Sequence, residues 1–118
     1  MKIIIAGAGE VGFHLAKLLS YESLDITLID IDRDRLNYAE GHLDIKTLRG
    51  NASSLALLKE SDVAESDLFI AVTASESVNI TVCILAKQLG SQKTIARISN
   101  AEFINADEKI SFVDIGVD

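Results

Sequence analysis

Continuous apolar runs alternate along the chain with segments whose apolar residues recur every three to four positions. Short continuous runs are typical of strands buried on both faces of a parallel sheet, whereas the longer spacing is typical of covering helices. The pattern predicts strands at residues 3–5, 25–29, 45–48, 68–72, 94–98 and 110–113. It predicts helices at residues 11–19, 32–41, 54–60, 76–89 and 101–109, the second one beginning at the N-cap Asp32 and stopped by Gly41.

Five strand–helix units followed by a final strand are the order expected of a doubly wound sheet with right-handed crossovers. We therefore predict an α/β Rossmann fold, with six parallel strands in the order 3-2-1-4-5-6 and helices on both faces. At 118 residues the chain is about large enough to bury one core, so residues 1–118 are expected to form a single domain.

Three glycines with the spacing G-x-G-x-x-G lie between the first strand and the first helix, at Gly7, Gly9 and Gly12. Gly7 permits a tight turn, Gly9 lets the backbone approach a pyrophosphate, and Gly12 lets the helix pack against the strand. The N–H groups of the first helical turn then face the phosphates at the positive end of the helix dipole. By chance alone the glycine pattern occurs in about 4% of chains of this size, and its place between strand and helix makes it more specific.

Asp30 ends the second strand at about the ~20-residue offset where a dinucleotide site has an acid. A carboxylate accepts a hydrogen bond from a ribose 2′-OH and repels a 2′-phosphate, which favours NAD or a plain adenosine nucleotide over NADP. Arg33 and Arg35 lie close enough in the sequence to weaken that preference. A purely structural glycine turn is the alternative interpretation.

Composition argues against several classes of function. The net charge of −7 argues against a nucleic-acid partner, because binding a phosphate backbone requires clustered lysine and arginine. No apolar run approaches the ~20 residues of a membrane span, and the first strand begins too early for a signal peptide, so we expect a cytoplasmic protein. His14 and His42 lack the spacing of metal ligands, and Cys83, the single cysteine, is expected in the core.

Polar residues follow the third and fourth strands and lie near the end of the fifth, at the edge where ligands of parallel sheets bind. They are the turn at residues 49–53, Thr73, Glu76, Asn79 and Arg97. Arg97 has two interpretations, a group that meets a phosphate or an acid, and a strand-end arginine that reaches solvent. No histidine or tyrosine is expected at this edge to act as a general acid or base, so we expect a nucleotide sensor rather than an enzyme.

Five blocks of the sequence resemble the N-terminal domain of the RCK (KTN) family, to which the TrkA potassium-uptake regulatory subunits belong. The blocks are residues 3–12, 28–32, 49–52, 71–80 and 95–98, and the resemblance extends over essentially the whole chain. It implies a Rossmann domain of a cytoplasmic regulator that forms a homo-oligomer, a dimer or a ring, beneath a Trk-type membrane potassium transporter. Binding of NAD or NADH, or of ATP, ADP or AMP, is then expected to change the shape of the ring and gate ion flow.

The resemblance also implies a set of nucleotide-binding residues and no catalytic or metal-binding ones. They are Gly7, Ala8, Gly9, Glu10, Val11, Gly12, Asp30, Ile31, Asp32, Arg33, Asn51, Ala52, Thr73, Ala74, Glu76, Asn79 and Arg97. Many relatives have Asp or His at the position of Asn51, and several continue beyond Asp118 into a regulatory domain, which we expect to be absent here. The alternatives are the cofactor-binding half of an NAD-dependent dehydrogenase and a scaffold with a vestigial site.

Overall fold

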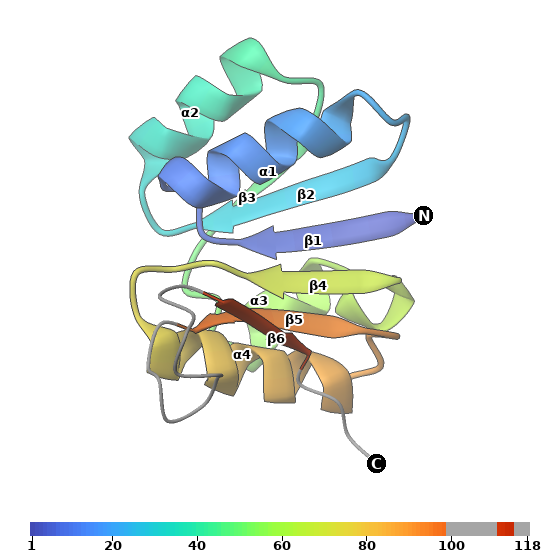
Figure 1. Cartoon of the computed structure of the whole chain (residues 1–118). Helices are drawn as coiled ribbons and strands as arrows, with labels where there is room; N and C mark the ends of the chain where they lie inside the picture. The colour runs from blue at the N-terminus through green and yellow to red at the C-terminus, as the bar shows by residue number, and fades with distance from the viewer. Residues whose placement is uncertain (99–110, 115–118) are drawn as a thin grey trace.

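The computed structural model of the chain describes residues 1–98 and the strand at residues 111–114, so the expected helix at residues 101–109 lies outside the described residues. Strands and helices alternate as the hydrophobic pattern predicts (Figure 1). The strands are β1 (Lys2–Ala6), β2 (Asp25–Asp30), β3 (Lys46–Arg49), β4 (Leu68–Ala71), β5 (Thr94–Ile98) and β6 (Ser111–Asp114). The helices are α1 (Glu10–Ser20), α2 (Arg33–His42), α3 (Leu55–Glu60) and α4 (Glu76–Gln88), with a short 3-10 turn, η1 (Val63–Glu65).

The strands form one sheet in the order β3-β2-β1-β4-β5-β6, which confirms the predicted order. β1 to β5 are parallel to their neighbours, and β1 lies between β2 and β4. β6 runs antiparallel to β5, so the prediction of a fully parallel sheet is wrong at this edge. The short run at residues 110–113 has no feature that specifies strand direction, and an antiparallel edge strand on an otherwise parallel sheet is a common arrangement.

Alternate side chains of each strand face opposite layers of the fold, and both layers are apolar. Ile3 and Ile5 of β1 pack with residues of α1 and α2. Ile4 and Ala6 pack on the other side, with residues of α3 and α4. Helices therefore cover both faces, as predicted, and the central strand β1 is buried from Ile3 to Ala6 because neither of its faces meets water. Cys83 of α4 is fully buried in the second layer, as expected of a small core residue.

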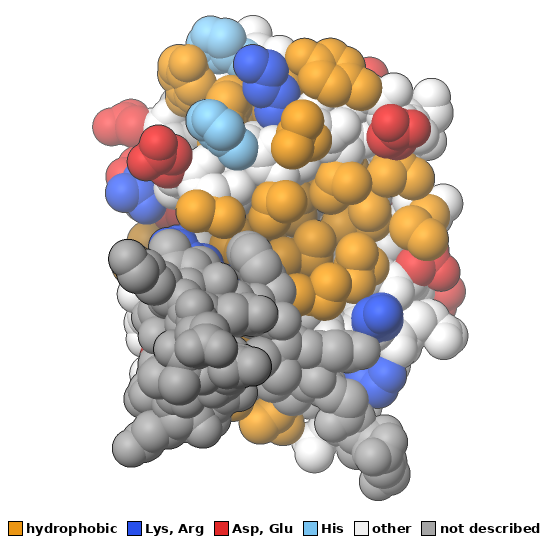
Figure 2. Space-filling model, viewed as in Figure 1, with side chains coloured by type: hydrophobic (Ala, Val, Ile, Leu, Met, Phe, Trp, Pro, Cys, Tyr) orange, Lys and Arg blue, Asp and Glu red, His pale blue; other side chains and the backbone are white. Residues whose placement is uncertain are grey.

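The apolar layer that contains α1 continues beyond this helix onto β4, the strand next to β1. Figure 2 shows apolar side chains gathered on this face. Leu68 and Ile70 of β4 belong to the same cluster as Leu15 and Leu19 of α1, while Leu18 is 65% exposed. Within the described part of the chain, no helix has both the length and the apolar character needed to span a bilayer.

Side chains cap the start of three helices. Asp32 begins α2 as predicted, because its Oδ1 accepts the backbone N–H two residues on at 2.9 Å. Ser54 and Ser75 cap α3 and α4 in the same way. The prediction that α2 stops at Gly41 is wrong, since the helix continues to His42. Gly41 is not among the glycines with positive φ, so it lacks the left-handed conformation with which glycine usually ends a helix.

Candidate functional site

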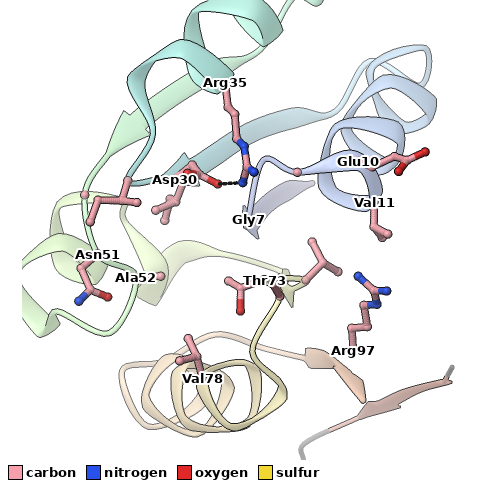
Figure 3. Close-up of a pocket in the computed structure, with 16 residues that line it drawn as sticks. Gly7, Glu10, Val11, Asp30, Arg35, Asn51, Ala52, Thr73, Val78 and Arg97 are labelled. Carbon is pink, nitrogen blue, oxygen red and sulfur yellow. Dashed lines mark ion pairs between the residues drawn. The ribbon is translucent and has the colours of Figure 1, made fainter. Parts of the chain in front are cut away.

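The carboxyl ends of the parallel strands open into one cavity. The register aligns Ala6 with Ile29 on one side and with Ala71 on the other, and Asp30 with Arg49, so the loops that follow these strands meet at one edge. The cavity has a volume of about 570 Å³, which is within the range of small-molecule sites. Figure 3 shows its walls, formed by the glycine turn, the end of β2, the loop after β3 and the start of α4.

Gly7 and Gly12 form the tight contact between β1 and α1. Gly7 has φ +115°, a conformation that disfavours any side chain, and its N–H donates to the Ile29 carbonyl at 2.8 Å. A Cβ at Gly7 would lie 2.9 Å from the Val72 backbone carbonyl. A Cβ at Gly12 would overlap the Gly7 carbonyl oxygen. Gly7 therefore makes the tight turn and Gly12 lets α1 pack against β1, as the motif predicts.

Gly9 has the third role, because its side-chain position opens into the cavity. Among the described residues, a Cβ there would find one atom within 4 Å, Nη1 of Arg35 at 3.7 Å. Gly9 is also the N-cap of α1 and supplies no side-chain cap, so the first-turn N–H groups face the cavity with no intrahelical partner. Glu10 and Val11 line the same wall. The arrangement suits an anion, which would accept these hydrogen bonds at the positive end of the helix dipole.

Asp30 braces the glycine turn as well as lining the cavity. Its Oδ2 accepts the N–H of Ala8 at 2.7 Å, and its Oδ1 accepts the N–H of Asp32 at 2.8 Å. Its side chain is only 9% exposed. Two carboxylate oxygens offer about four acceptor positions, so Asp30 retains capacity for a ligand hydroxyl after both backbone bonds are made. The sequence predicts the ligand role; the bracing role is visible only in the structure.

Arg35, and not Arg33, points toward the cavity. Its Nη1 lies 3.9 Å from Oδ2 of Asp30, the ion pair drawn as a dashed line in Figure 3, and its Nε lies 3.8 Å from Oδ2 of Asp32. Arg33 is exposed and is not among the described residues that line the cavity. Two positions apart on a helix, at about 100° per residue, the two side chains leave on nearly opposite sides.

Asn79 lies behind the cavity wall that Thr73 and Arg97 form, and it hydrogen-bonds to both of these residues. The side chain is 1% exposed, and its Oδ1 accepts both the N–H of Thr73, at 2.8 Å, and the Thr73 hydroxyl, at 2.6 Å. Its Nδ2 donates to the carbonyls of Thr73 and Arg97, at 3.1 and 3.0 Å. Asn79 does not line the cavity, whereas its neighbour Val78 does. It ties the loop after β4 to the end of β5 rather than meeting a ligand.

Arg97 lines the cavity from β5, at the far side from Asp30. Figure 3 shows its side chain directed toward Val11 at the start of α1. It is half-buried, and none of the ion pairs found among the described residues involves it. This position agrees with the first of the two interpretations, a cation that meets an anion at the carboxyl edge.

The loop after β3 closes the cavity beside the end of β2. The N–H of Gly50 donates to the Asp30 carbonyl at 3.0 Å. Gly50 has φ +154°, a conformation that residues with a side chain rarely adopt. Asn51 Oδ1 accepts the N–H of Ser53 at 2.8 Å, which makes a local turn and presents Asn51 and Ala52 to the cavity.

Most of the predicted residues line the cavity, and the others lie beside it. From the first half of the site the structure brings together Gly7, Gly9, Glu10, Val11, Asp30 and Ile31. From the second half it brings Asn51, Ala52, Thr73, Ala74 and Arg97. The predicted residues outside the lining are Ala8, Gly12, Asp32, Arg33, Glu76 and Asn79. The prediction missed Ile29, Arg35, Gly50, Val72 and Val78. Among these, strand position alone could have identified Ile29 and Val72, because each precedes a predicted loop at the carboxyl edge.

The histidines lie away from this edge. His42 stacks on Tyr38 with ring centroids 4.0 Å apart, on the surface formed by α1 and α2. In the described part of the chain, no group of three His, Cys, Asp or Glu side chains has an arrangement that could hold a metal ion.

Comparison with known proteins shows which family model and which relatives the chain resembles. Residues 3–117 match the TrkA-N domain family. The chain is 40% identical over 111 residues to the Trk system potassium uptake protein TrkA of Haemophilus influenzae, which covers 93% of this chain and 24% of that protein. It therefore spans about a quarter of the length of that relative.

Two solved structures with bound nucleotides share the fold. The GsuK channel bound to NAD superposes with a TM-score of 0.69 at 18% identity, over 79% of this chain and 17% of that one. The Kef CTD of Shewanella denitrificans in its AMP-bound form superposes with a TM-score of 0.63 at 21% identity, over 75% of this chain and 52% of that one. At these identities the likeness shows the fold alone.

Proposed function

The chain belongs to the TrkA-N domain family, and on that premise we propose that it is the nucleotide-sensing domain of a regulator of potassium uptake. The observation that carries the proposal is the cavity at the carboxyl edge, where Gly9 leaves the first-turn N–H groups of α1 open and Asp30 stands across from them. An adenosine nucleotide needs both features, since its phosphate accepts hydrogen bonds and its ribose hydroxyls donate them.

The ligand is an adenine nucleotide, with NAD or NADH first and ATP, ADP or AMP as alternatives. The structures with the same fold support this choice, because one carries NAD and another AMP. All these ligands share the adenosine and its 5′-phosphate, which is the part that Asp30 and the start of α1 are placed to meet. Arg97, at the other end of the cavity, adds a positive charge for whatever lies beyond that phosphate.

The regulated partner is a membrane potassium transporter of the Trk type, as the name of the Haemophilus relative suggests. We place the protein in the cytoplasm, bound through that partner at the inner face of the membrane, as a homo-oligomer that is a dimer or a ring. Nucleotide binding shifts the balance between two arrangements of neighbouring domains. A ligand does this only through unequal affinity: moving a 1:99 balance to 99:1 takes about a 10⁴-fold difference.

Thermal unfolding with and without nucleotides tests the binding step. A ligand that binds only the folded chain raises the midpoint by mass action, and at 100 times its Kd it adds about 2.7 kcal/mol of stability. We expect AMP, ADP, ATP, NAD and NADH to raise the midpoint, and GMP, with the same phosphate but another base, to raise it less. Unchanged midpoints with every adenine nucleotide at millimolar concentration would refute the proposal.

Hydride transfer is the rival use of the same cavity. It requires an acid or base beside the nicotinamide, and among the described residues the carboxylic acids that line the cavity are Glu10, which is exposed, and Asp30, which already accepts two backbone N–H groups. An NADH absorbance assay with a panel of small carbonyl compounds separates the two uses. The sensing proposal expects NADH to bind and to remain unoxidised; turnover would favour the dehydrogenase.

A further inference from the structure

Arg35 lines the cavity, and its two long ion pairs do not explain why an arginine stands at this position. It is the third residue of α2, where a positive side chain is unfavourable to the helix dipole. The guanidinium faces two carboxylates, at 3.9 Å from Asp30 and 3.8 Å from Asp32. Both distances exceed the usual hydrogen-bond range, although an arginine with a settled carboxylate partner makes short, paired bonds.

The ion pairs of Arg35 are therefore weak. The side chain is 56% exposed, and exposed pairs with this geometry contribute little to stability. Asp30 does not depend on the pair, since Ala8 and Asp32 already donate N–H groups to its two oxygens. Moving the Arg35 side chain away from these two carboxylates therefore lowers the stability of the protein only slightly.

The guanidinium lies beside the place where a phosphate would sit. Nη1 is 3.7 Å from the position of a Cβ on Gly9, the residue whose missing side chain opens the start of α1 to the cavity. Figure 3 shows the side chain descending from α2 between Asp30 and the first turn of α1. A phosphate bound to the first-turn N–H groups would thus be within reach of Arg35 after a small rotation of its side chain.

We propose that Arg35 is a movable counter-ion that selects phosphorylated adenosines, exchanging its loose contacts with Asp30 and Asp32 for the phosphate on the ligand's 5′ carbon. The inference rests on the proposed function, because it assumes that an adenosine nucleotide occupies this cavity. It adds that discrimination between AMP and adenosine comes from a residue of α2 as well as from the helix dipole. Nothing in the glycine pattern assigns this role.

A phosphate can be attached to the adenosine ribose at the 5′ or the 2′ position, and the structure favours the first. The 5′-phosphate is the group that the open N–H groups of α1 are placed to receive. A 2′-phosphate would stand against the carboxylate of Asp30, which is held in place by two backbone hydrogen bonds. 5′-AMP and 2′-AMP have the same composition and charge, so a difference in their binding shows which position of the phosphate the site accepts.

Calorimetric titration of adenosine, 5′-AMP and 2′-AMP into the chain and two variants tests the proposal. Arg35→Gln removes the guanidinium and keeps much of the side-chain length. Arg33→Gln is the matched control, because it removes the same charge two residues away, outside the cavity lining. We expect Arg35→Gln to weaken 5′-AMP binding about tenfold and to leave adenosine unchanged. Arg33→Gln should change 5′-AMP binding less than twofold, and Arg35→Lys should restore part of the loss.

The outcomes distinguish the inference from the proposed function. If the unaltered chain binds neither nucleotide, the proposed function fails, and this inference fails with it. If it binds 5′-AMP and Arg35→Gln binds it equally well, only the role of Arg35 is refuted. A selective loss of 2′-AMP, or an equal loss for adenosine and 5′-AMP, would also overturn the role. Thermal unfolding of each variant without ligand confirms that both glutamine variants are folded.

Discussion

The substitution Gly12→Ala, which adds one methyl group, tests whether α1 can pack against β1 only when residue 12 has no side chain. In the structure, a Cβ on Gly12 would overlap the Gly7 carbonyl oxygen and lie 2.8 Å from the Gly7 carbonyl carbon. Real Cβ atoms essentially never lie closer than 3.0 Å to another heavy atom, and here both obstacles are backbone. Gly12→Ala therefore cannot be relieved by a rotamer change, and α1 must move away from the turn.

The cost follows from what α1 covers. Ala16 of α1 is completely buried, and Ile3, Ile5 and Leu28 pack in the same layer. Lifting the first turn loosens this layer and displaces the turn that Asp30 braces. Overpacking that moves backbone costs about 3 kcal/mol or more. That is a large share of a total stability of about 5 to 15 kcal/mol.

Urea unfolding followed by circular dichroism measures the loss. Gly41→Ala is the matched control: it adds the same methyl inside a helix, at a position with nothing within 4 Å. We expect the control to gain about 0.5 to 1 kcal/mol, because alanine is the better helix former. A Gly12→Ala variant within 1 kcal/mol of the unaltered chain, at unchanged m-value, would refute the packing role of Gly12.

Three further substitutions separate binding from folding. Gly9→Ala places its methyl in open cavity space, so calorimetry should show AMP binding at least about tenfold weaker while the unfolding free energy changes by less than about 1 kcal/mol. Asp30→Ala leaves two backbone N–H groups without their acceptor, so the unfolding free energy measured in urea should fall by about 1 to 3 kcal/mol, and calorimetry should show weaker AMP binding. Asn79→Ala removes four buried hydrogen bonds, and urea unfolding should show a loss of about 3 kcal/mol; a loss below 1 kcal/mol would contradict its tying role.

The strand order and the cavity edge were predictable because both depend on local signals. Apolar runs mark the strands, right-handed crossovers restrict their order, and the residue after each parallel strand lies at the ligand edge. The glycine spacing also predicted which glycine meets which neighbour. Gly7 and Gly12 contact backbone, and Gly9 does not.

The features that the sequence did not predict depend on the orientation of side chains and strands, which residue types alone do not determine. Arg33 and Arg35 are the same residue type two positions apart, and only the direction in which α2 leaves β2 decides which one meets the cavity. The direction of β6 is a similar case, since an apolar run has the same pattern in both directions. Asn79 was placed at the ligand because it is polar and near a strand end. Its place on the buried side of α4, among apolar residues, is the signal that pointed instead to an internal tie.

Consecutive positions at the start of α4 have opposite surroundings, and this affects how the family can change its ligand. Val78 faces the cavity, while Asn79 is enclosed behind it and carries the hydrogen bonds of the wall. A substitution at Val78 alters the shape of the cavity without touching those bonds. Under the proposed function, ligand preference can therefore change by single substitutions that leave the wall of the cavity intact.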